Sequence, residues 1–276
     1  MKRACIVGWP VRHSRSPMIH RYWLAEHGIT GDYLQEGVAP ADFETFLRSL
    51  ADRGYVGCNV TLPHKEMAFA LLDEIEPAAA ALGAANTIWL DGGRLHGTNS
   101  DVGGFLASLD AEQPGWAGET GHCLVLGAGG AARGIVHGLL SRGVPRVTLA
   151  NRSLAKAEAI AAEFGPRIRP AALSEIAAAL PSVDLLVNTT ALGMKGQPPL
   201  DLDLEGLKAT AIVSDIVYVP LETALIVQAA ARGHRTVGGL GMLLYQAVPG
   251  FSRWFGVTPQ VTPALYELVA ADVRGS

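Results

Sequence analysis

The most constraining feature of this sequence is a glycine-rich turn between two apolar runs in residues 122–153. The run at 123–126 is too short for a buried helix, and it is followed by the turn, an amphipathic segment and a second, largely apolar run at 147–150. This order predicts strand, turn, helix and strand, which together form a βαβ unit. The chain is therefore expected to contain a parallel sheet of the Rossmann type.

The turn itself carries Gly127, Gly129 and Ala132 in G-x-G-x-x-A spacing. The first glycine permits a tight turn, the second lets the backbone approach a pyrophosphate, and the alanine lets helix and strand pack closely. The helix N-terminus then faces the phosphates. The spacing predicts dinucleotide binding, and the alternative is a glycine-rich turn that serves packing alone.

The residues after the second predicted strand bear on which dinucleotide is bound. An NAD site usually has an acidic residue there, whereas this chain has Asn151, Arg152 and Ser153, with Lys156 one turn later. Arginine forms charge-assisted bonds to a 2′-phosphate and can also lie over the adenine. We therefore predict NADP as the cofactor. The alternative is that Arg152 and Lys156 are solvated surface charges.

The composition excludes several classes of protein. The 276 residues are enough for two domains that each bury a core, and 49% hydrophobic and 17% charged residues are typical of a globular protein. A net charge of −4 argues against binding to nucleic acid or to an anionic membrane. No apolar stretch has membrane-spanning length, and no signal-peptide core develops after Met1.

The cysteines and histidines show no metal-ligand spacing. Cys5, Cys58 and Cys123 lie far apart in predicted strands, and the eight histidines form no HExxH motif. We predict buried reduced thiols, a cytoplasmic location and no metal.

The residues before the glycine turn alternate strand and helix patterns. Strands are predicted at 4–7, 32–38 and 57–61, helices from Pro17 onward, at 40–53 and at 65–82, and a hairpin at 86–98 turning at Asp91-Gly92-Gly93. A helix at 102–109 and a turn-rich linker at 114–118 follow. Alternating strands and helices predict a parallel α/β arrangement.

The residues after the glycine turn continue this alternation. Helices are predicted at 155–164, 174–180 and 223–232, strands at 183–187, 211–217 and 235–237, and two last helices at 240–247 and 263–273. The last helices are expected to return to the first domain, since the nucleotide-binding unit is complete without them. We predict an α/β fold of two domains: an N-terminal α/β substrate domain, residues 1–104 plus 240–276, and a Rossmann-type NADP-binding domain, residues 105–239.

Polar side chains gather after the first predicted strands. Ligands of parallel sheets bind beyond the carboxyl ends of the strands, where Ser14, Ser16, Asn59, Thr61 and Lys65 are expected. The alternatives are helix capping for the serines and a solvated side chain for the lysine.

With these residues in hand, the chain resembles the shikimate dehydrogenase family over nearly its full length. The motifs that carry the resemblance are HSRSP at 13–17, NVTLPHK at 59–65, GAANT at 83–87, NSD at 99–101, GAGGAAR at 127–133, NRS at 151–153, NTTALGM at 188–194, DIVY at 215–218 and GGLGMLLYQA at 238–247.

The resemblance implies NADP-dependent, reversible reduction of 3-dehydroshikimate to shikimate, a small-molecule substrate of aromatic amino-acid synthesis. It implies a catalytic acid/base pair of Lys65 and Asp101. The implied substrate contacts, besides this pair, are Ser14, Ser16, Asn59, Thr61, Asn86, Tyr218 and Gln246. The implied cofactor contacts are Gly127, Ala128, Gly129, Gly130, Ala131, Asn151, Arg152, Ser153, Lys156, Met194 and Gly239.

These residue types suit the implied chemistry. Negative charge grows on a ketone oxygen that accepts hydride, and a lysine can supply both a positive field and a proton there. A partnered Asp101 would orient the ammonium and accept a bond from a substrate hydroxyl. Serine hydroxyls at a helix start would suit a carboxylate.

The sequence departs from the usual family pattern at Arg21, Pro77, Ser100, Val102 and Val219. Ser100 keeps the hydroxyl of the more frequent threonine, whereas Val102 replaces a glycine beside Asp101. A quinate/shikimate dehydrogenase of broader substrate or cofactor use stays open as an alternative, as does a non-catalytic NADP-binding sensor. The expected assembly is a monomer or a homodimer.

Overall fold

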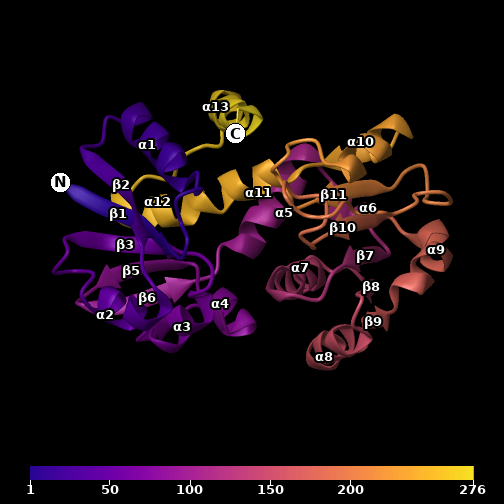
Figure 1. The fold of residues 1–276 in the computed structure, drawn as a ribbon, viewed down its shortest axis with the longest axis horizontal. Coiled ribbons are helices and arrows are strands. Elements are labelled where there is room, and N and C mark those ends of the chain that lie inside the picture. Colours follow the sequence, from indigo (N-terminus) through magenta and orange to yellow (C-terminus); the bar gives the residue numbers. More distant parts are fainter. Residues whose placement is uncertain (276) are drawn as a thin grey trace. The chain divides into compact units, whose positions relative to one another are not determined.

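The computed structural model describes residues 1–275, and the chain divides into two compact units. Unit 1 comprises Met1–Gly104 and Leu244–Val269, and unit 2 comprises Phe105–Leu243 and the residues from Ala270 onward. Each unit has a sheet of its own, drawn in indigo to magenta for the first and in magenta to orange for the second (Figure 1).

The sheet of unit 1 has six strands in the order β2-β1-β3-β5-β6-β4. Strand β1 pairs in parallel with β2 and β3, whereas β5 runs antiparallel to β3 and β6. The strands are β1 (Lys2–Gly8), β2 (Gly31–Gly37), β3 (Tyr55–Val60), β4 (Glu74–Ile75), β5 (Thr87–Asp91) and β6 (Arg94–Thr98). The predicted hairpin at 86–98 is confirmed, and Gly92 and Gly93 adopt φ of 55° and 78° at its tip.

Helices cover both faces of this sheet (Figure 1). They are α1 (Ser16–Glu26), the 3₁₀ turn η1 (Pro40–Asp42), α2 (Phe43–Arg48), α3 (Lys65–Ala70), α4 (Pro77–Leu82) and α12 (Ala247–Phe255). On one face Phe43, Leu47 and Ile88 are fully buried in a common core. On the other, α12 packs on β1, β3 and β5 through residues that include the buried Trp254.

Two helix predictions in unit 1 are wrong in extent. The helix expected at 40–53 ends at Arg48. The helix expected at 65–82 is interrupted, because Asp73 and Glu76 donate backbone hydrogen bonds to the β6 carbonyls of Leu95 and Gly97. Pro77 then starts a new helix, as proline favours a first helical turn.

The sheet of unit 2 has six strands, all parallel, in the order β12-β11-β10-β7-β8-β9. The strands are β7 (Cys123–Leu126), β8 (Val147–Ala150), β9 (Ile168–Ala171), β10 (Leu185–Asn188), β11 (Ile212–Asp215) and β12 (Arg235–Val237). Strand order reverses at β7, so the glycine turn lies at the switch point where such sheets bind ligands. The Rossmann-type prediction is confirmed.

The helices of unit 2 include the α7 helix that follows the glycine turn. They are α6 (Trp116–Glu119), α7 (Gly130–Ser141), α8 (Leu154–Phe164), η2 (Leu173–Glu175), α9 (Ile176–Ala179), η3 (Leu180–Ser182) and α10 (Ala224–Ala231). Three helices span the unit boundaries in sequence: α5 (Asp101–Glu112), α11 (Gly239–Tyr245) and α13 (Pro263–Arg274).

Besides β4, which lies inside the helix expected at 65–82, three elements were not predicted from the sequence. Strand β9 was missed, since only Ile168 and Ala171 of its four residues are buried and no apolar run marks it. Helix α12 was missed between the two last predicted helices, because Pro249 and Gly250 interrupt its apolar pattern. The predicted linker at 114–118 contains part of α6, and Trp116 buries its ring there.

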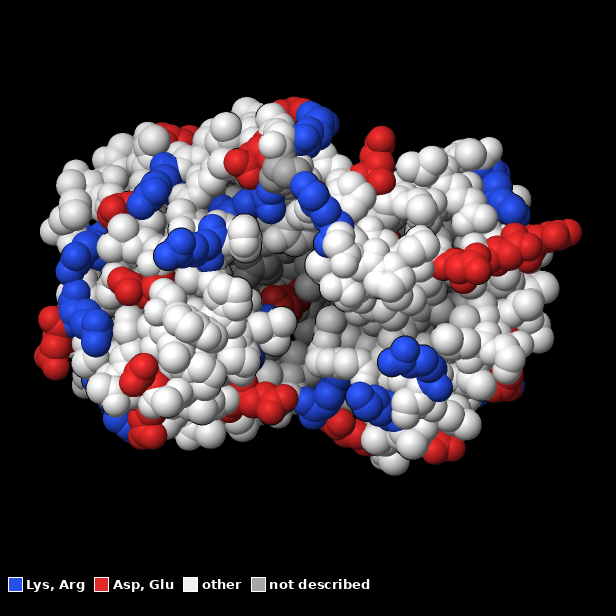
Figure 2. All heavy atoms as spheres, in the orientation of Figure 1, with Lys and Arg blue, Asp and Glu red and all other residues white. Residues whose placement is uncertain are grey.

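Charged side chains are distributed over the visible surface of both units (Figure 2). On the face drawn in Figure 2, acidic and basic side chains are scattered among uncharged ones in both units. No helix in residues 1–275 combines the length and apolar character needed to cross a membrane.

Candidate active site

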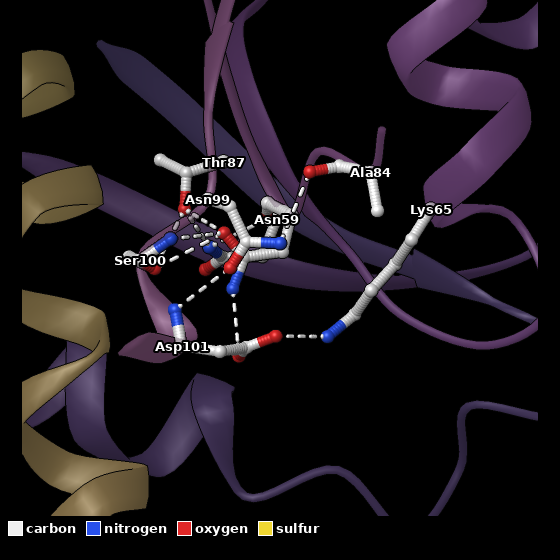
Figure 3. A network of polar contacts seen from close by, with 8 residues as sticks. Asn59, Lys65, Ala84, Thr87, Asn99, Ser100 and Asp101 are labelled. Carbon is white, nitrogen blue, oxygen red and sulfur yellow. Dashed lines mark hydrogen bonds and ion pairs between the residues drawn. The ribbon is translucent and has the colours of Figure 1, made fainter. Parts of the chain in front are cut away.

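Four polar residues of unit 1 stand at element ends. Asn59 is the penultimate residue of β3, Lys65 is the first of α3, Asn86 immediately precedes β5, and Asp101 is the first of α5. Figure 3 shows the Lys65 side chain extending from its helix toward Asp101. Residues at four separate elements thus share one network.

The Lys65 ammonium and the Asp101 carboxylate form an ion pair, with 2.5 Å between Nζ and Oδ2. Their side chains are 26% and 31% exposed, so each can still meet a ligand from solvent. The Lys65 carbonyl also accepts a hydrogen bond from the Ala85 N–H at 2.9 Å, which fixes the start of α3 against the segment before β5.

Asn86 supports the aspartate from its other side. Its Nδ2 donates to Asp101 Oδ1 at 2.8 Å, while its Oδ1 accepts from the Ser100 backbone N–H, also at 2.8 Å. Asn99 adds a second support, because its Oδ1 accepts from the Asp101 N–H and its Nδ2 donates to the Ala84 carbonyl. Both carboxylate oxygens of Asp101 are therefore held, one by an amide and one by an ammonium.

The serine loop lies at the end of β1. The Ser14 hydroxyl accepts from the Ser16 N–H at 3.3 Å, so its own hydrogen can be donated to a ligand. Ser16 is 3% exposed and begins α1, whose first N–H groups have no helical partner. The loop is tied to the one after β3 by a hydrogen bond from the Trp9 N–H to the Leu62 carbonyl at 3.0 Å. Thr61, half-buried, precedes that carbonyl.

The glycine turn of unit 2 has the geometry expected from its spacing. Gly127 has φ of +107°, and a Cβ there would lie 2.7 Å from the Thr189 hydroxyl oxygen. A Cβ on Gly129 would meet no atom within 4 Å, which leaves its backbone open to a phosphate group. Ala132 is fully buried where α7 packs. The three positions thus provide a turn, an open approach and a close packing contact, in that order.

A cavity of about 570 Å³ lies beside this turn, wholly within unit 2. Gly127, Asn151 and Arg152 line it, and the Asn151 side chain donates to the Ser153 carbonyl at 2.9 Å, which shapes the loop after β8. The sequence had pointed to these residues but not to other parts of the lining, which include residues 173–174, 176–177 and 199–203. No spacing rule marks those segments, since they meet the glycine turn only in the fold.

The other cofactor candidates lie around the same end of the sheet. Gly130, Ala131, Ser153 and Lys156 are exposed and Ala128 is half-buried. Met194, in the loop after β10, is 41% exposed. Gly239 is buried, and a Cβ there would lie 2.3 Å from the Ile216 carbonyl oxygen, so only glycine fits without a shift.

A buried carboxylate holds the loops that carry Met194 and Tyr218. Asp215 accepts hydrogen bonds from Asn188 Nδ2 at 2.9 Å and from the Thr223 hydroxyl at 2.7 Å. Burial raises the pKa of Asp215, although the bonds from Thr223, Val217 and Asn188 oppose the rise. Sequence reasoning quoted both motifs without assigning these residues a role. Tyr218 follows in unit 2, whereas Gln246 belongs to unit 1, and both are half-buried.

The sequence was compared with those of known protein families. The shikimate dehydrogenase substrate binding domain matches residues 6–88, the shikimate / quinate 5-dehydrogenase family matches 113–194, and the shikimate 5′-dehydrogenase C-terminal domain matches 239–265. A protein of Azorhizobium caulinodans named shikimate dehydrogenase (NADP⁺) is 58% identical over 99% of this chain and 97% of its own.

The chain belongs to the shikimate dehydrogenase family.

Solved structures of this family share the fold described above. The shikimate 5-dehydrogenase of Thermus thermophilus, in complex with NADP(H) and shikimate, aligns with a TM-score of 0.87 and 35% identity over 99% of this chain and 100% of that one. The quinate dehydrogenase of Corynebacterium glutamicum, in complex with NAD, aligns with a TM-score of 0.89 and 28% identity over 98% and 100%. Since both align closely, the fold alone does not distinguish these two substrates.

Metal-binding side chains were sought separately from the family comparison. Within the described residues, no group of three or more His, Cys, Asp or Glu side chains is arranged to hold a metal ion. The three cysteines are free and buried.

Proposed function

We propose that this protein catalyses the NADP-dependent, reversible reduction of 3-dehydroshikimate to shikimate. The observation that carries the proposal is the Lys65–Asp101 pair, which is partly exposed and braced by Asn86. An accessible ammonium held beside a carboxylate is suited to proton transfer at a substrate oxygen. The shared family and the NADP(H) and shikimate bound to the Thermus thermophilus enzyme support the same reaction.

The residues around the glycine turn fit NADP. The open backbone at Gly129 suits a pyrophosphate, and the exposed Arg152 suits a 2′-phosphate at the rim of the cavity. NADPH, when bound, supplies the hydride for the ketone. Met194, in the loop after β10, and Gly239, at the start of α11, are proposed to contact it.

The chain's own residues are proposed to handle the proton and the substrate. The Lys65 ammonium donates a proton to the carbonyl oxygen as that oxygen gains charge, and the resulting amine regains a proton from water. In the reverse direction the neutral amine takes the proton. Asp101 orients the ammonium and accepts a hydrogen bond from a ring hydroxyl. Asn86 is proposed to contact the same hydroxyl. The Ser14 and Ser16 hydroxyls and the start of α1 hold the substrate carboxylate.

The remaining substrate candidates complete the proposal. Thr61, Tyr218 and Gln246 are proposed to contact the ring or its carboxylate. We also propose that residues 1–104 and 240–276 form the substrate domain and residues 105–239 the NADP domain.

The proposal is tested by initial rates on purified protein, with shikimate or quinate combined with NADP or NAD. We expect turnover largely confined to shikimate with NADP. Comparable rates with quinate or NAD would instead indicate a quinate/shikimate dehydrogenase of broader substrate or cofactor use. An absence of turnover in every combination would favour a non-catalytic NADP-binding sensor. Absorbance of the reduced nicotinamide reports each rate.

We further propose that the protein acts in the cytoplasm as a monomer or homodimer. Free thiols at Cys5, Cys58 and Cys123 suit a reducing compartment. The Lys65–Asp101 pair lies within one unit of one chain, so a second copy is not needed to complete it. Fractionation and a hydrodynamic mass measurement test these two statements.

A further inference from the structure

A buried hydrogen-bond chain begins at Tyr33 in the middle of β2. Tyr33 is fully buried, and its hydroxyl donates to Asn59 Oδ1 at 2.6 Å. The His20 ring stacks on the phenol at a centroid distance of 4.0 Å, which fixes the plane of the ring. Burial raises the pKa of Tyr33 well above its usual value, so the hydroxyl stays protonated and acts as a donor.

Asn59 carries the chain across to β5. Its Nδ2 donates to the Asn86 carbonyl and to the Thr87 hydroxyl oxygen, each at 3.1 Å. Both amide hydrogens are thus used inside the protein, and the residue is 3% exposed. A flipped amide would set its oxygen against the Asn86 carbonyl and lose the bond from the Tyr33 hydroxyl, so the carbonyl and Tyr33 together favour one orientation.

Thr87 and Ser100 connect Asn59 to the Asn86 side chain. The Asn86 Oδ1 lies 3.0 Å from the Thr87 hydroxyl and 3.1 Å from the Ser100 hydroxyl, and it also accepts from the Ser100 N–H. With these donors around its oxygen, the Asn86 carboxamide must turn its NH₂ toward Asp101 Oδ1. Figure 3 shows Asn59, Thr87 and Ser100 converging beside Asp101.

We propose that Tyr33 is a positioning residue, whose hydroxyl acts through Asn59, Thr87 and Ser100 to fix the Asn86 carboxamide and thereby the Asp101 carboxylate against Lys65. The proposal rests on the function proposed above. It adds an orienting task to the substrate contact that the family resemblance implies for Asn59. Tyr33 and Asn59 are both buried, so neither needs to touch the substrate to act.

The variant Tyr33→Phe tests the first link of the chain. It removes one oxygen and leaves Asn59 Oδ1 buried without that donor, so that only the two Nδ2 bonds still hold the amide. We expect kcat with shikimate and NADP to fall by roughly 3- to 30-fold and the pH profile of kcat to shift. NADP affinity, measured by calorimetry, should stay unchanged because the glycine turn is untouched.

Tyr55→Phe is the matched control. Tyr55 lies on β3 in the same sheet, is 6% exposed and donates its hydroxyl to Glu36, which takes no part in the chain. This variant should lose comparable stability while keeping the wild-type kcat and pH profile. A purely structural role for Tyr33 would give both variants the same kinetics.

Thr87 tests the middle of the chain. Thr87→Val removes the hydroxyl and should lower kcat, whereas Thr87→Ser keeps it and should restore most of the rate. The double variant Tyr33→Phe/Thr87→Val should be little worse than the poorer single variant, since both interrupt one chain. If Tyr33→Phe fails to fold, the proposal is tested by comparing kcat of Thr87→Val with that of Thr87→Ser.

Two outcomes overturn the inference. One is a folded Tyr33→Phe protein with the wild-type kcat and pH profile, and the other is equal activity of the Val and Ser variants at position 87. These differ from failure of the proposed function, in which the unaltered protein itself shows no turnover with shikimate and both proposals fall together.

Discussion

At the scale of single residues, the ion pair of Lys65 and Asp101 concentrates the proposed chemistry. The ammonium is the donor expected to reach the ketone oxygen, and its partner is itself held by Asn86. Neighbouring residues can replace part of the field of a lost lysine, but not its transferable proton. Loss of Lys65 is therefore expected to affect turnover more than substrate binding.

Lys65→Ala should lower kcat by roughly 10²- to 10⁴-fold, the usual range for a lost general acid or base, with a smaller change in KM. Steady-state kinetics with shikimate and NADP measure both. Lys208→Ala is the matched control, because Lys208 forms a similar pair with Asp184 at 2.6 Å in unit 2. A folded Lys65→Ala protein with the wild-type kcat would show that Lys65 is not the general acid.

Arg152 is proposed to recognise the 2′-phosphate that distinguishes NADP from NAD. Arg152→Ala should weaken NADP binding by roughly 10- to 100-fold, as for a lost hydrogen bond to a charged group, and leave NAD binding nearly unchanged. Arg146→Ala offers a control, since Arg146 is an exposed arginine just before β8 and Arg152 follows that strand. Equal losses for both cofactors would assign Arg152 to structure.

His20 makes stability depend on pH. Burial lowers the pKa of His20 from 6.5 to about 3, and an interaction with the Asn59 side chain only partly opposes this shift. The unfolded chain takes up a proton as the pH falls below 6.5, whereas the folded protein does so only near pH 3. Stability from this residue is therefore full above pH 6.5 and decreases as the pH falls toward 3.

Urea unfolding at pH 7 and pH 5 measures this dependence. The wild type should lose about 2 kcal/mol more than His20→Phe between these two values. Identical losses would mean that the His20 ring is accessible to protons in the folded state.

At the scale of elements, strand β3 and helix α12 pack so closely that a side chain larger than glycine does not fit between them at position 57. A Cβ on Gly57 would lie 2.1 Å from the Trp254 ring nitrogen and 2.3 Å from the Ile88 carbonyl oxygen. That nitrogen donates to the same carbonyl at 2.9 Å. Any side chain at position 57 would separate the helix from the sheet and break this buried bond.

Gly57→Ala should therefore reduce the free energy of unfolding by about 3 kcal/mol, through overpacking and a lost buried hydrogen bond. Chemical denaturation provides the measurement. Gly103→Ala serves for comparison, since a Cβ there meets no atom within 4 Å in α5, and it should be neutral or slightly stabilising. Similar effects of both changes would contradict the packing argument.

Elements with strong local signals could be predicted from the sequence. The glycine turn, the strands beside it and the hairpin at Gly92 and Gly93 each depend on neighbouring residues. Strand β9 and the break between α3 and α4 depend instead on pairing with distant strands, which local patterns do not encode. The same limit applied to the site: its residues were predictable as motifs, whereas the chain from Tyr33 to Asn86 crosses three strands.

At the scale of the whole molecule, two units with separate sheets are expected to respond to separate ligands. Shikimate should slow amide hydrogen exchange mainly in β3, α3 and the start of α5, and NADP mainly in β7, α7 and β8, because a ligand stabilises the structure that binds it. Exchange followed by mass spectrometry on each complex measures this. Protection of β7, α7 and β8 by shikimate alone would contradict the division.

Unit 1 is built from both ends of the sequence, with α12 supplied after all of 105–243. On a ribosome that adds about 5 to 20 residues per second, roughly 140 intervening residues take about 7 to 28 s. Throughout that interval the nascent first sheet lacks Trp254 and Phe251, both buried on it in the finished protein. The newborn chain thus completes its second sheet while the first still shows an apolar face, the kind of surface that chaperones bind during synthesis.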